Sequence, residues 1–358
     1  MSDTATDIDK RLLQTLVPVN ALTLGHLDTL LRDITVEIIC AGKTLFVAGE
    51  YDYKHVYLLS GSVEFSDQSG NTMVLQAGDP VCRFPLFQQF PRQYTVAAQQ
   101  DCHVIRFDGD RLDSMLAWDQ ACRYIALDIS SQRSLDEDAD WMLTLLRSNL
   151  FYKVPPMNIR QILDKFTACY FSAGDMVLRQ GEVGDCCYFI KEGRAGVYQS
   201  ADEKSLAALV NELSVGCFFG EDALVNEAVR NASIEMHTNG VLMKLDKRDF
   251  YLLLRQPKVE AMPLALAQAA VDDGAQWIDV RTQEEFDQSH IPGSLHLPLD
   301  ILQLKSRLLD KTKHYILYCN SGRRSEAAVY LLGLEGFQLS SLKGGYQPEP
   351  LLSLASSR

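Results

Sequence analysis

Two stretches of this 358-residue chain repeat one pattern of glycines, and this repeat limits the possible folds more than any other feature. The first stretch, AGKTLFVAGEYDYKHVYLLSGSVEF, starts at Ala41, and the second, AGDMVLRQGEVGDCCYFIKEGRAGVY, starts at Ala173. The glycines that lie 132 positions apart are Gly42 and Gly174, Gly49 and Gly181, and Gly61 and Gly193. Further on, the offset becomes 138, for Gly78 with Gly216 and for Arg92 with Arg230. We infer two copies of one unit, with a longer loop in the second.

Each copy has the pattern of short strands. Apolar residues alternate in pieces such as VYLL, YFI and VLMKL, and glycine or aspartate separates these pieces. Such spacing predicts a small antiparallel barrel or jelly roll, with helical patterns flanking it. The length of the chain allows two or three domains.

The second copy ends in FFGEDALVNEAVRNAS, residues 218–233, which has the residue types of an anion site. Gly220 allows the backbone to approach a ligand, and the amides of residues 222–224 open a short helix. Arg230 can close on the same anion with its planar guanidinium, and Glu221 can accept hydrogen bonds from a hydroxyl. A ligand that carries an anionic group beside a hydroxyl is typical of a nucleotide, so the segment predicts a nucleotide site.

This segment resembles the phosphate-binding cassette of the cyclic nucleotide-binding domain family. The resemblance implies that Glu221 holds the ribose 2′-hydroxyl and Arg230 the cyclic phosphate, assisted by Gly220, Ala223 and the turn at Asn231 and Ala232. Asp222 departs from the family pattern, in which an apolar residue follows the glutamate. Asn231 lies where family members select the base, so cyclic AMP and cyclic GMP both stay open, with cyclic AMP favoured as the commoner bacterial-type ligand. A barrel that keeps the motif only as scaffold is the alternative.

The first copy resembles the same fold but lacks the polar residues of the cassette. Cys82 replaces the glycine, Arg83 replaces the glutamate, Pro85 interrupts the helical turn, and Arg92 is retained. Removal of one partner from a buried polar contact costs about 2–5 kcal/mol, so nucleotide binding is not expected here. We expect a structural role or a partner surface, with a different anion between Arg83 and Arg92 as the alternative.

After Pro257 the pattern changes to strands that alternate with helices, which predicts a small α/β domain with a parallel sheet. In YCNSGRRS, residues 318–325, Cys319 follows an apolar strand and precedes a helix. Parallel sheets place their ligand sites at this end of the strands. A helix N-terminus and the neighbouring Arg323 and Arg324 favour the thiolate form of a cysteine. A buried core cysteine is the plainer alternative.

The loop CNSGRR resembles the active-site loop of rhodaneses, which are sulfurtransferases, and the resemblance extends from IDVRTQEEFDQSHIPGSLHLPL to LKGGY. It implies that Cys319 carries a persulfide cradled by the amides of Asn320, Ser321, Gly322, Arg323 and Arg324. Arg323 and Arg324 would receive a small anionic sulfur donor such as thiosulfate, and Asp279 with Arg281 would support the site. Asn320 stands where the family often has arginine. A cysteine-based phosphatase needs five residues between cysteine and arginine, and Ser325 occupies that position here.

Composition excludes several functions. The formal net charge is −13, and no Lys/Arg-rich run is present, so we expect neither nucleic acid nor an anionic membrane as a partner. The acidic N-terminus and the lack of a long apolar stretch predict a cytoplasmic protein. Nine scattered cysteines and seven histidines without ligand-like spacing predict neither a disulfide framework nor a metal site.

Together these features predict a multidomain protein with two β-barrel domains and an α/β domain. The expected boundaries are 1–135 for a degenerate cyclic nucleotide-binding domain, 136–260 for an intact one and 261–358 for a rhodanese domain. The predicted function is a cyclic nucleotide-responsive sulfurtransferase with an unidentified thiol acceptor. The oligomeric state stays open, with a homodimer as one option. The alternative is a non-catalytic sensing or scaffold protein. The predicted helix from Asp246 to Arg255 leads from the second barrel to the rhodanese domain.

Overall fold

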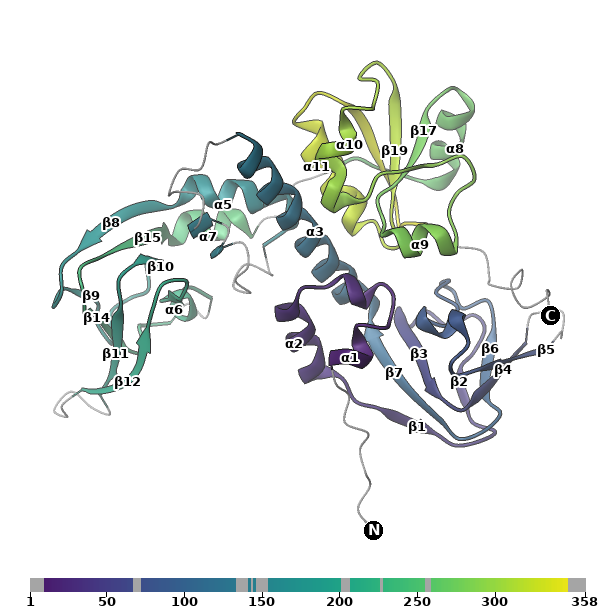
Figure 1. Cartoon of the computed structure of the whole chain (residues 1–358), viewed down its shortest axis with the longest axis horizontal. Helices are drawn as coiled ribbons and strands as arrows, with labels where there is room; N and C mark the ends of the chain where they lie inside the picture. Colours follow the sequence, from purple (N-terminus) through teal and green to yellow (C-terminus); the bar gives the residue numbers. More distant parts are fainter. Residues whose placement is uncertain are drawn as a thin grey trace, which may run out of the picture. The chain divides into compact units, whose positions relative to one another are not determined.

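The computed structural model describes residues 10–66, 72–132, 141–142, 144–145, 154–200, 207–225, 228–254 and 259–346 (Figure 1). The chain forms two compact units. One contains residues 1–124 and 259–358, and the other contains residues 125–258. The first barrel and the predicted rhodanese region therefore belong to one unit, and the second barrel forms the other.

The first barrel consists of two antiparallel sheets, in the orders β1-β7-β3 and β2-β6-β4-β5. Its strands are β1 (Glu37–Ile39), β2 (Thr44–Phe46), β3 (Lys54–Ser60), β4 (Ser62–Ser66), β5 (Thr72–Gln76), β6 (Thr95–Ala98) and β7 (Cys102–Asp108). The flanking helices are α1 (Lys10–Leu13), α2 (Leu24–Asp33) and α3 (Gly109–Gln132), and a 3-10 turn η2 spans Pro80–Arg83. One apolar core lies inside the barrel, and a second packs the helices against β3 and β7.

The same unit contains a five-stranded parallel sheet in the order β16-β20-β19-β17-β18. Its strands are β16 (Ala261–Met262), β17 (Gln276–Asp279), β18 (Leu295–His296), β19 (His314–Tyr318) and β20 (Gln338–Leu342). The helices are α8 (Leu264–Asp272), α9 (Gln283–Gln288), α10 (Leu302–Ser306) and α11 (Arg323–Gly333), with a 3-10 turn η5 at Leu299–Ile301. The apolar run of β19 is buried at the centre of the sheet, as a parallel strand requires.

The second unit repeats the barrel, with sheets in the orders β13-β10-β15-β8 and β12-β11-β14-β9. Its strands are β8 (Thr167–Phe171), β9 (Met176–Leu178), β10 (Cys186–Glu192), β11 (Ala195–Gln199), β12 (Ala208–Leu213), β13 (Phe218–Phe219), β14 (Ser233–Met236) and β15 (Gly240–Asp246). The helices are α5 (Ile159–Lys165), α6 (Glu221–Val225) and α7 (Lys247–Leu253), with a 3-10 turn η4 at Pro156–Asn158. Asp246 precedes α7 as predicted, whereas Arg255 lies outside the described residues.

The glycine repeat has a backbone cause. Gly61 and Gly193 occupy the same turn of the two barrels, with φ of 86° and 95°. A Cβ on Gly61 would lie 2.4 Å from the carbonyl oxygen of Asp101, and one on Gly193 would lie 2.9 Å from that of Asn239. Only glycine fits both the left-handed conformation and the close approach of the next hairpin. The predicted fold class is confirmed: two β-rich barrels and an α/β domain with a parallel sheet.

Candidate functional site

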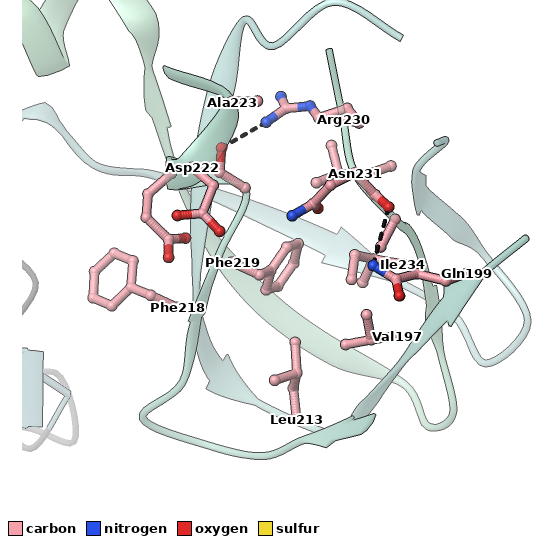
Figure 2. A pocket seen from close by; sticks show the side chains of 14 residues that line it. Val197, Gln199, Leu213, Phe218, Phe219, Asp222, Ala223, Arg230, Asn231 and Ile234 are labelled. Atoms are coloured by element: carbon pink, nitrogen blue, oxygen red, sulfur yellow. Dashed lines mark hydrogen bonds between the residues drawn. The ribbon is translucent and has the colours of Figure 1, made fainter. Parts of the chain in front are cut away.

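A cavity of about 210 Å³ opens in the second barrel beside α6 (Figure 2). Its polar wall includes Glu221, Arg230 and Asn231. Its apolar wall consists of side chains from the barrel strands and the loops that join them: Leu178, Val197, Leu213, Phe219 and Ile234. An apolar pocket with a few convergent polar groups is the usual form of a small-molecule site.

Arg230 is fixed at one end of this cavity. It is 3% exposed, and its Nη1 donates to the carbonyl oxygen of Gly220 at 2.8 Å. Its Nη2 donates to the carbonyl oxygen of Cys186 at 2.8 Å and to Oδ1 of Asp185 at 3.1 Å. A Cβ at position 220 would come within 2.9 Å of Nη1, and Gly220 has φ of 87°, so glycine is required beside the guanidinium.

Glu221 presents a carboxylate that the described residues do not satisfy. Its Oε2 is buried and has no hydrogen-bond partner among them. Burial is the main cause that raises the pKa of Glu221, and the neighbouring Asp222 raises it further. A buried acceptor without a donor is costly, so a ligand hydroxyl that donates to Oε2 would be stabilising.

All six cassette residues predicted from the sequence line this one cavity: Gly220, Glu221, Ala223, Arg230, Asn231 and Ala232. The sequence interpretation did not include Gln199, whose Nε2 donates to the carbonyl oxygen of Asn231 at 3.2 Å, nor the apolar wall. The alternation of β11 would have placed Val197 and Gln199 on one face. The roles of the six cassette residues toward a ligand stay a prediction.

Helix α7 is tied to the cassette by direct hydrogen bonds. The hydroxyl of Tyr251 donates to the carbonyl oxygen of Leu224 at 2.7 Å, and the amide of Lys247 donates to the carbonyl oxygen of Asp185 at 2.7 Å. Asp185 in turn contacts Arg230. A displacement of α6 or of Arg230 would therefore act on α7 through Tyr251 and Lys247.

The first barrel fills the corresponding space with its own side chains. Phe65, Phe87 and Tyr94 contact one another there, with ring centroids 4.6 to 5.6 Å apart. Cys82, which replaces the cassette glycine, belongs to the same core, and burial raises the pKa of its thiol to about 11. The retained Arg92 is buried and donates to Asp52 at 2.7 Å.

Arg83 and Arg92 do not share a site. Arg83 is half exposed and donates to Glu284 of the α/β domain at 2.8 Å and to the carbonyl oxygen of Thr15 at 3.0 Å. Arg92 is held by Asp52 and by the Phe46 and Phe90 rings, whose centroids lie 4.2 and 4.6 Å away. The alternative in which these two arginines hold one anion is therefore not supported by the geometry.

Cys319 lies at the carboxyl end of β19, directly before the loop that leads to α11. Its side chain is fully buried, and the amide of Gly322 donates to Sγ at 3.1 Å. The hydroxyl of Ser325 lies 3.7 Å from Sγ. Gly322 has φ of 99°, so the loop bends sharply enough to point an amide back at the sulfur. Amide donors aimed at sulfur stabilise a thiolate.

The segment after β20 contacts the loop that follows Cys319. The amide of Tyr346 donates to the carbonyl oxygen of Cys319 at 2.6 Å. A Cβ on Gly345 would lie only 2.2 Å from the carbonyl oxygen of Asn320. The GGY motif of the sequence thus has a steric function, because any side chain at position 345 would displace the loop.

The structure assigns the arginines of the loop to protein carboxylates. Arg324 is fully buried and donates to both carboxylate oxygens of Glu285, at 2.7 and 2.8 Å. Burial acts to raise the pKa of Glu285, but Arg324 outweighs it and lowers that pKa to about 2. Arg323 is partly exposed and lies 3.4 Å from Asp110 of the first barrel. Both arginines thus have carboxylate partners here, although Nε of Arg324 has no hydrogen-bond partner among the described residues. Their predicted role toward an anionic sulfur donor stays a prediction.

The predicted support residues form a second ion pair beside the loop. Arg281 donates to Asp279 at 2.7 Å, and its Nη1 donates to Oδ1 of Asn320 at 3.1 Å. Nδ2 of Asn320 donates to Glu285 at 2.8 Å. Glu285 was missed from the sequence, although the TQEE run indicates a capping box, and the structure forms one between Thr282 and Glu285.

Comparison with protein-family models agrees with this architecture. The cyclic nucleotide-binding domain model matches residues 36–119 and 168–256, and the rhodanese-like domain model matches residues 263–348. The chain therefore carries two cyclic nucleotide-binding domains followed by a rhodanese-like domain. The exact boundaries expected from the sequence stay predictions.

Known relatives match parts of the chain. The cAMP-dependent protein kinase regulatory subunit of Yarrowia lipolytica is 27% identical over 64% of this chain and 58% of its own length. The cGMP-dependent protein kinase egl-4 of Caenorhabditis briggsae is 24% identical over 60% of this chain and 27% of its own length. The chain thus spans less than two thirds of these relatives. A solved regulatory domain of Toxoplasma gondii PKA with cAMP is 21% identical, covers 68% of this chain and 90% of its own, and has a TM-score of 0.31.

Two kinds of feature are absent from the described part of the chain. No group of three or more His, Cys, Asp or Glu side chains there could hold a metal ion. Within the same residues, no helix is both long and apolar enough to span a bilayer.

Proposed function

We propose that this protein is a sulfurtransferase whose activity or access to partners responds to a cyclic nucleotide. The observation that carries the enzymatic part is the amide of Gly322, which donates to Sγ of Cys319 at 3.1 Å at the end of a buried parallel strand. A lone buried cysteine has no need of such a donor, whereas a nucleophilic thiolate does.

The sulfur step follows from ordinary thiol chemistry. The Cys319 thiolate attacks the outer sulfur of a donor such as thiosulfate, a sulfur–sulfur bond forms, and the donor's own sulfur–sulfur bond breaks to release sulfite. The product is a persulfide anion on Cys319. A thiolate acceptor then attacks the outer sulfur and leaves Cys319 as a thiolate. No external oxidant or reductant is needed in either step.

The nucleotide part rests on the second barrel. Arg230, which the carbonyl oxygens of Gly220 and Cys186 hold at one end of the cavity, would bind the cyclic phosphate. Oε2 of Glu221, which has no hydrogen-bond partner among the described residues, would accept from a ribose hydroxyl. The exposed Asn231 and the side chain of Gln199 line the same cavity (Figure 2), and we assign them to contacts with the base. Nothing in this arrangement selects adenine over guanine, so cyclic AMP is the first ligand to test and cyclic GMP the second.

Coupling would begin at α7. Tyr251 and Lys247 connect this helix to the cassette, and the chain reaches β16 of the rhodanese-like domain within a few residues of its end. A ligand that binds two arrangements of α7 with different affinity would shift their populations. This is a proposal about chain connectivity and needs no contact between the two units.

The test measures thiosulfate:cyanide sulfurtransferase activity with and without cyclic AMP in the parent protein and in Arg230→Ala. We expect a change on addition of the nucleotide that is lost in the variant. A nucleotide effect that is absent in the parent, or unchanged in Arg230→Ala, removes the coupling and leaves the sulfur chemistry standing.

A non-catalytic sensing or scaffold role is the second candidate, and one observation favours it. Cys319 has no exposed surface, and carboxylates already engage the nearby arginines. Mass spectrometry of Cys319 after treatment with thiosulfate separates the two candidates. An added mass of one sulfur together with turnover supports the enzyme, whereas an unmodified Cys319 supports the scaffold.

A further inference from the structure

The first barrel packs directly against the rhodanese-like domain, and the two form one compact unit. Polar contacts connect them at several points. Arg83 donates to Glu284 at 2.8 Å, and the hydroxyl of Tyr124 donates to Glu335 at 2.8 Å. At the sulfur loop, Asp113 of α3 lies 3.6 Å from the guanidinium of Arg324. The barrel that has no nucleotide cassette is therefore the one that contacts the catalytic loop.

A cavity of about 210 Å³ lies between these two domains. The loop contributes Asn320 and Ser321, which are the two residues after Cys319, and the segment behind it contributes Tyr346. The barrel contributes the rest of the polar and aromatic wall, which includes Tyr53, His55, Phe90, Asp110 and Asp113. A pocket at the exit of the catalytic loop is the natural place for a substrate of Cys319.

Two polar atoms in this wall are buried and lack a hydrogen-bond partner among the described residues. They are Nδ1 of His55, a residue that is 5% exposed, and Oδ1 of Asp113, which is 1% exposed. Burial is the largest cause that lowers the pKa of His55, so its imidazole is neutral and one ring nitrogen can accept. Oδ1 of Asp113, whose ion pair with Arg324 is 3.6 Å long, can still accept a hydrogen bond from a ligand. Nδ1 of His55 accepts one in the tautomer that carries its proton on Nε2.

The charged side chains around the loop also favour a cationic ligand. The three arginines near Cys319 are engaged by four carboxylates: Arg281 by Asp279, Arg324 by Glu285 and Asp113, and Arg323 by Asp110. Among the described residues that line the cavity, Asp110 and Asp113 are the carboxylates, and no arginine or lysine is present. Because the four carboxylates outnumber the three arginines, which lie outside the lining, an anion that enters here would meet net negative charge.

We propose that this interdomain cavity binds the ammonium group of a small aminothiol, which exchanges sulfur with Cys319. The inference rests on the proposed sulfur transfer and specifies its substrate class. The aminothiol is deprotonated at sulfur and attacks the outer sulfur of the Cys319 persulfide, so one sulfur–sulfur bond forms as another breaks and Cys319 departs as a thiolate. Asp110 and Asp113 hold the ammonium group. The degenerate barrel thus acts as the substrate-recognition wall of the neighbouring domain.

The test uses two reagents of similar size and opposite charge on the full chain: 2-aminoethyl and 2-sulfonatoethyl methanethiosulfonate. The cysteine thiolate attacks the sulfenyl sulfur of either reagent and forms a mixed disulfide with its thioalkyl group, while the sulfur–sulfur bond to the sulfonyl group breaks and methanesulfinate leaves. Peptide mass spectrometry follows the rate of this reaction at Cys319 alone. The rate ratio of the cationic to the anionic reagent is compared with the same ratio for the urea-unfolded chain. We expect the folded protein to raise this ratio about tenfold, because two nearby carboxylates each contribute a few-fold preference.

Variants locate the origin of the preference. Asp110→Asn and Asp113→Asn should each lower the ratio about threefold. Asp110 is exposed, so its variant keeps the test sharp if Asp113→Asn does not fold. Asp33→Asn is the matched control, because Asp33 is an exposed carboxylate of the same barrel paired with Arg111 outside the cavity.

Three results would overturn the inference. They are a ratio equal to that of the unfolded chain, a ratio that Asp110→Asn and Asp33→Asn lower equally, and a Cys319 that neither reagent reaches in the folded protein. The assay measures access and charge rather than sulfur turnover. A Cys319 that shows the charge preference but never carries a persulfide would refute the proposed enzyme and leave the cation-binding cavity in place.

Discussion

The two barrels share a fold and differ in what occupies the position of the ligand. In the second barrel, Gly220 and Arg230 border an open cavity, and the carboxylate of Glu221 has a buried oxygen to which no described residue donates. In the first barrel, Phe87 and its aromatic neighbours fill that space, and Arg92 pairs with Asp52 instead. A repeat can therefore keep its scaffold while the polar interior of one copy is replaced by a packed core. The outer surface of that copy is then free to contact another domain.

The largest expected effect concerns Phe87, which packs in the aromatic core of the first barrel. Phe87→Ala should lower the free energy of unfolding of this unit by about 3–5 kcal/mol, the usual range for a buried phenylalanine. Nucleotide binding should stay unchanged, because the cavity it opens lacks the cassette. Urea unfolding and nucleotide titration of the same variant measure both. A variant that gained cyclic AMP binding would erase the distinction between the barrels.

The paired arginines should respond in opposite ways. Arg230→Ala should weaken nucleotide binding by about 30-fold to several thousandfold, because the phosphate loses its charged partner. Arg92→Ala should leave binding intact and lower the free energy of unfolding by about 3 kcal/mol, because Asp52 and buried carbonyl groups lose their donor. Calorimetric titration and urea unfolding of both variants give the comparison. Equal loss of binding in the two would show that the first barrel also senses nucleotide.

Acid should affect the two units through different carboxylates and over different pH ranges. The pKa of Glu285 is about 2 in the folded chain, below its ordinary value, so its ion pair stabilises the first unit fully above pH about 4.3. This contribution, about 3 kcal/mol at most, should disappear as the pH falls from about 4.3 to 2. Urea midpoints measured across that range provide the test. Glu285→Gln should flatten the dependence, and an equally steep curve in that variant would exclude Glu285 as its source.

In the second unit, the relevant carboxylate titrates at a higher pH than usual. The pKa of Glu221 is raised by burial, and its ionised form accepts a hydrogen bond from a ribose hydroxyl more strongly than its protonated form does. Nucleotide affinity should therefore fall as the pH drops through this raised pKa. Replacement of cyclic AMP by its 2′-deoxy analogue should reduce affinity about tenfold and remove the pH dependence. An analogue that binds as well as cyclic AMP would place the ribose elsewhere.

The smallest effect concerns the exposed partner of Arg230. Asp185 is 77% exposed at its side chain, and exposed ion pairs contribute little. Asp185→Asn should change the free energy of unfolding by less than about 1 kcal/mol and the nucleotide affinity by less than about threefold. The comparison with Arg230→Ala by the same titration tests whether the backbone carbonyls alone suffice to orient the guanidinium.

Most of the fold could be predicted from local sequence patterns. The glycine offsets identified the two barrels because left-handed turns recur wherever the strands do, and the apolar run before Cys319 identified the central parallel strand. The cassette could be predicted because its residues lie within one short segment. The contacts of Arg324 with Glu285 and Asp113 could not, because 39 residues separate the first pair and far more the second. No spacing rule relates side chains that only the tertiary fold brings together.

Helix α3 gives the arrangement a further consequence. It spans Gly109–Gln132, or about 36 Å at 1.5 Å per residue, and its first turns carry Asp110 and Asp113 into the cavity beside the sulfur loop. The boundary between the two compact units falls within this helix, between residues 124 and 125. Asp110 and Asp113 stand three residues apart near the start of α3, so they lie on one face of the helix. A helix-breaking residue in this first turn would therefore displace both cavity carboxylates together.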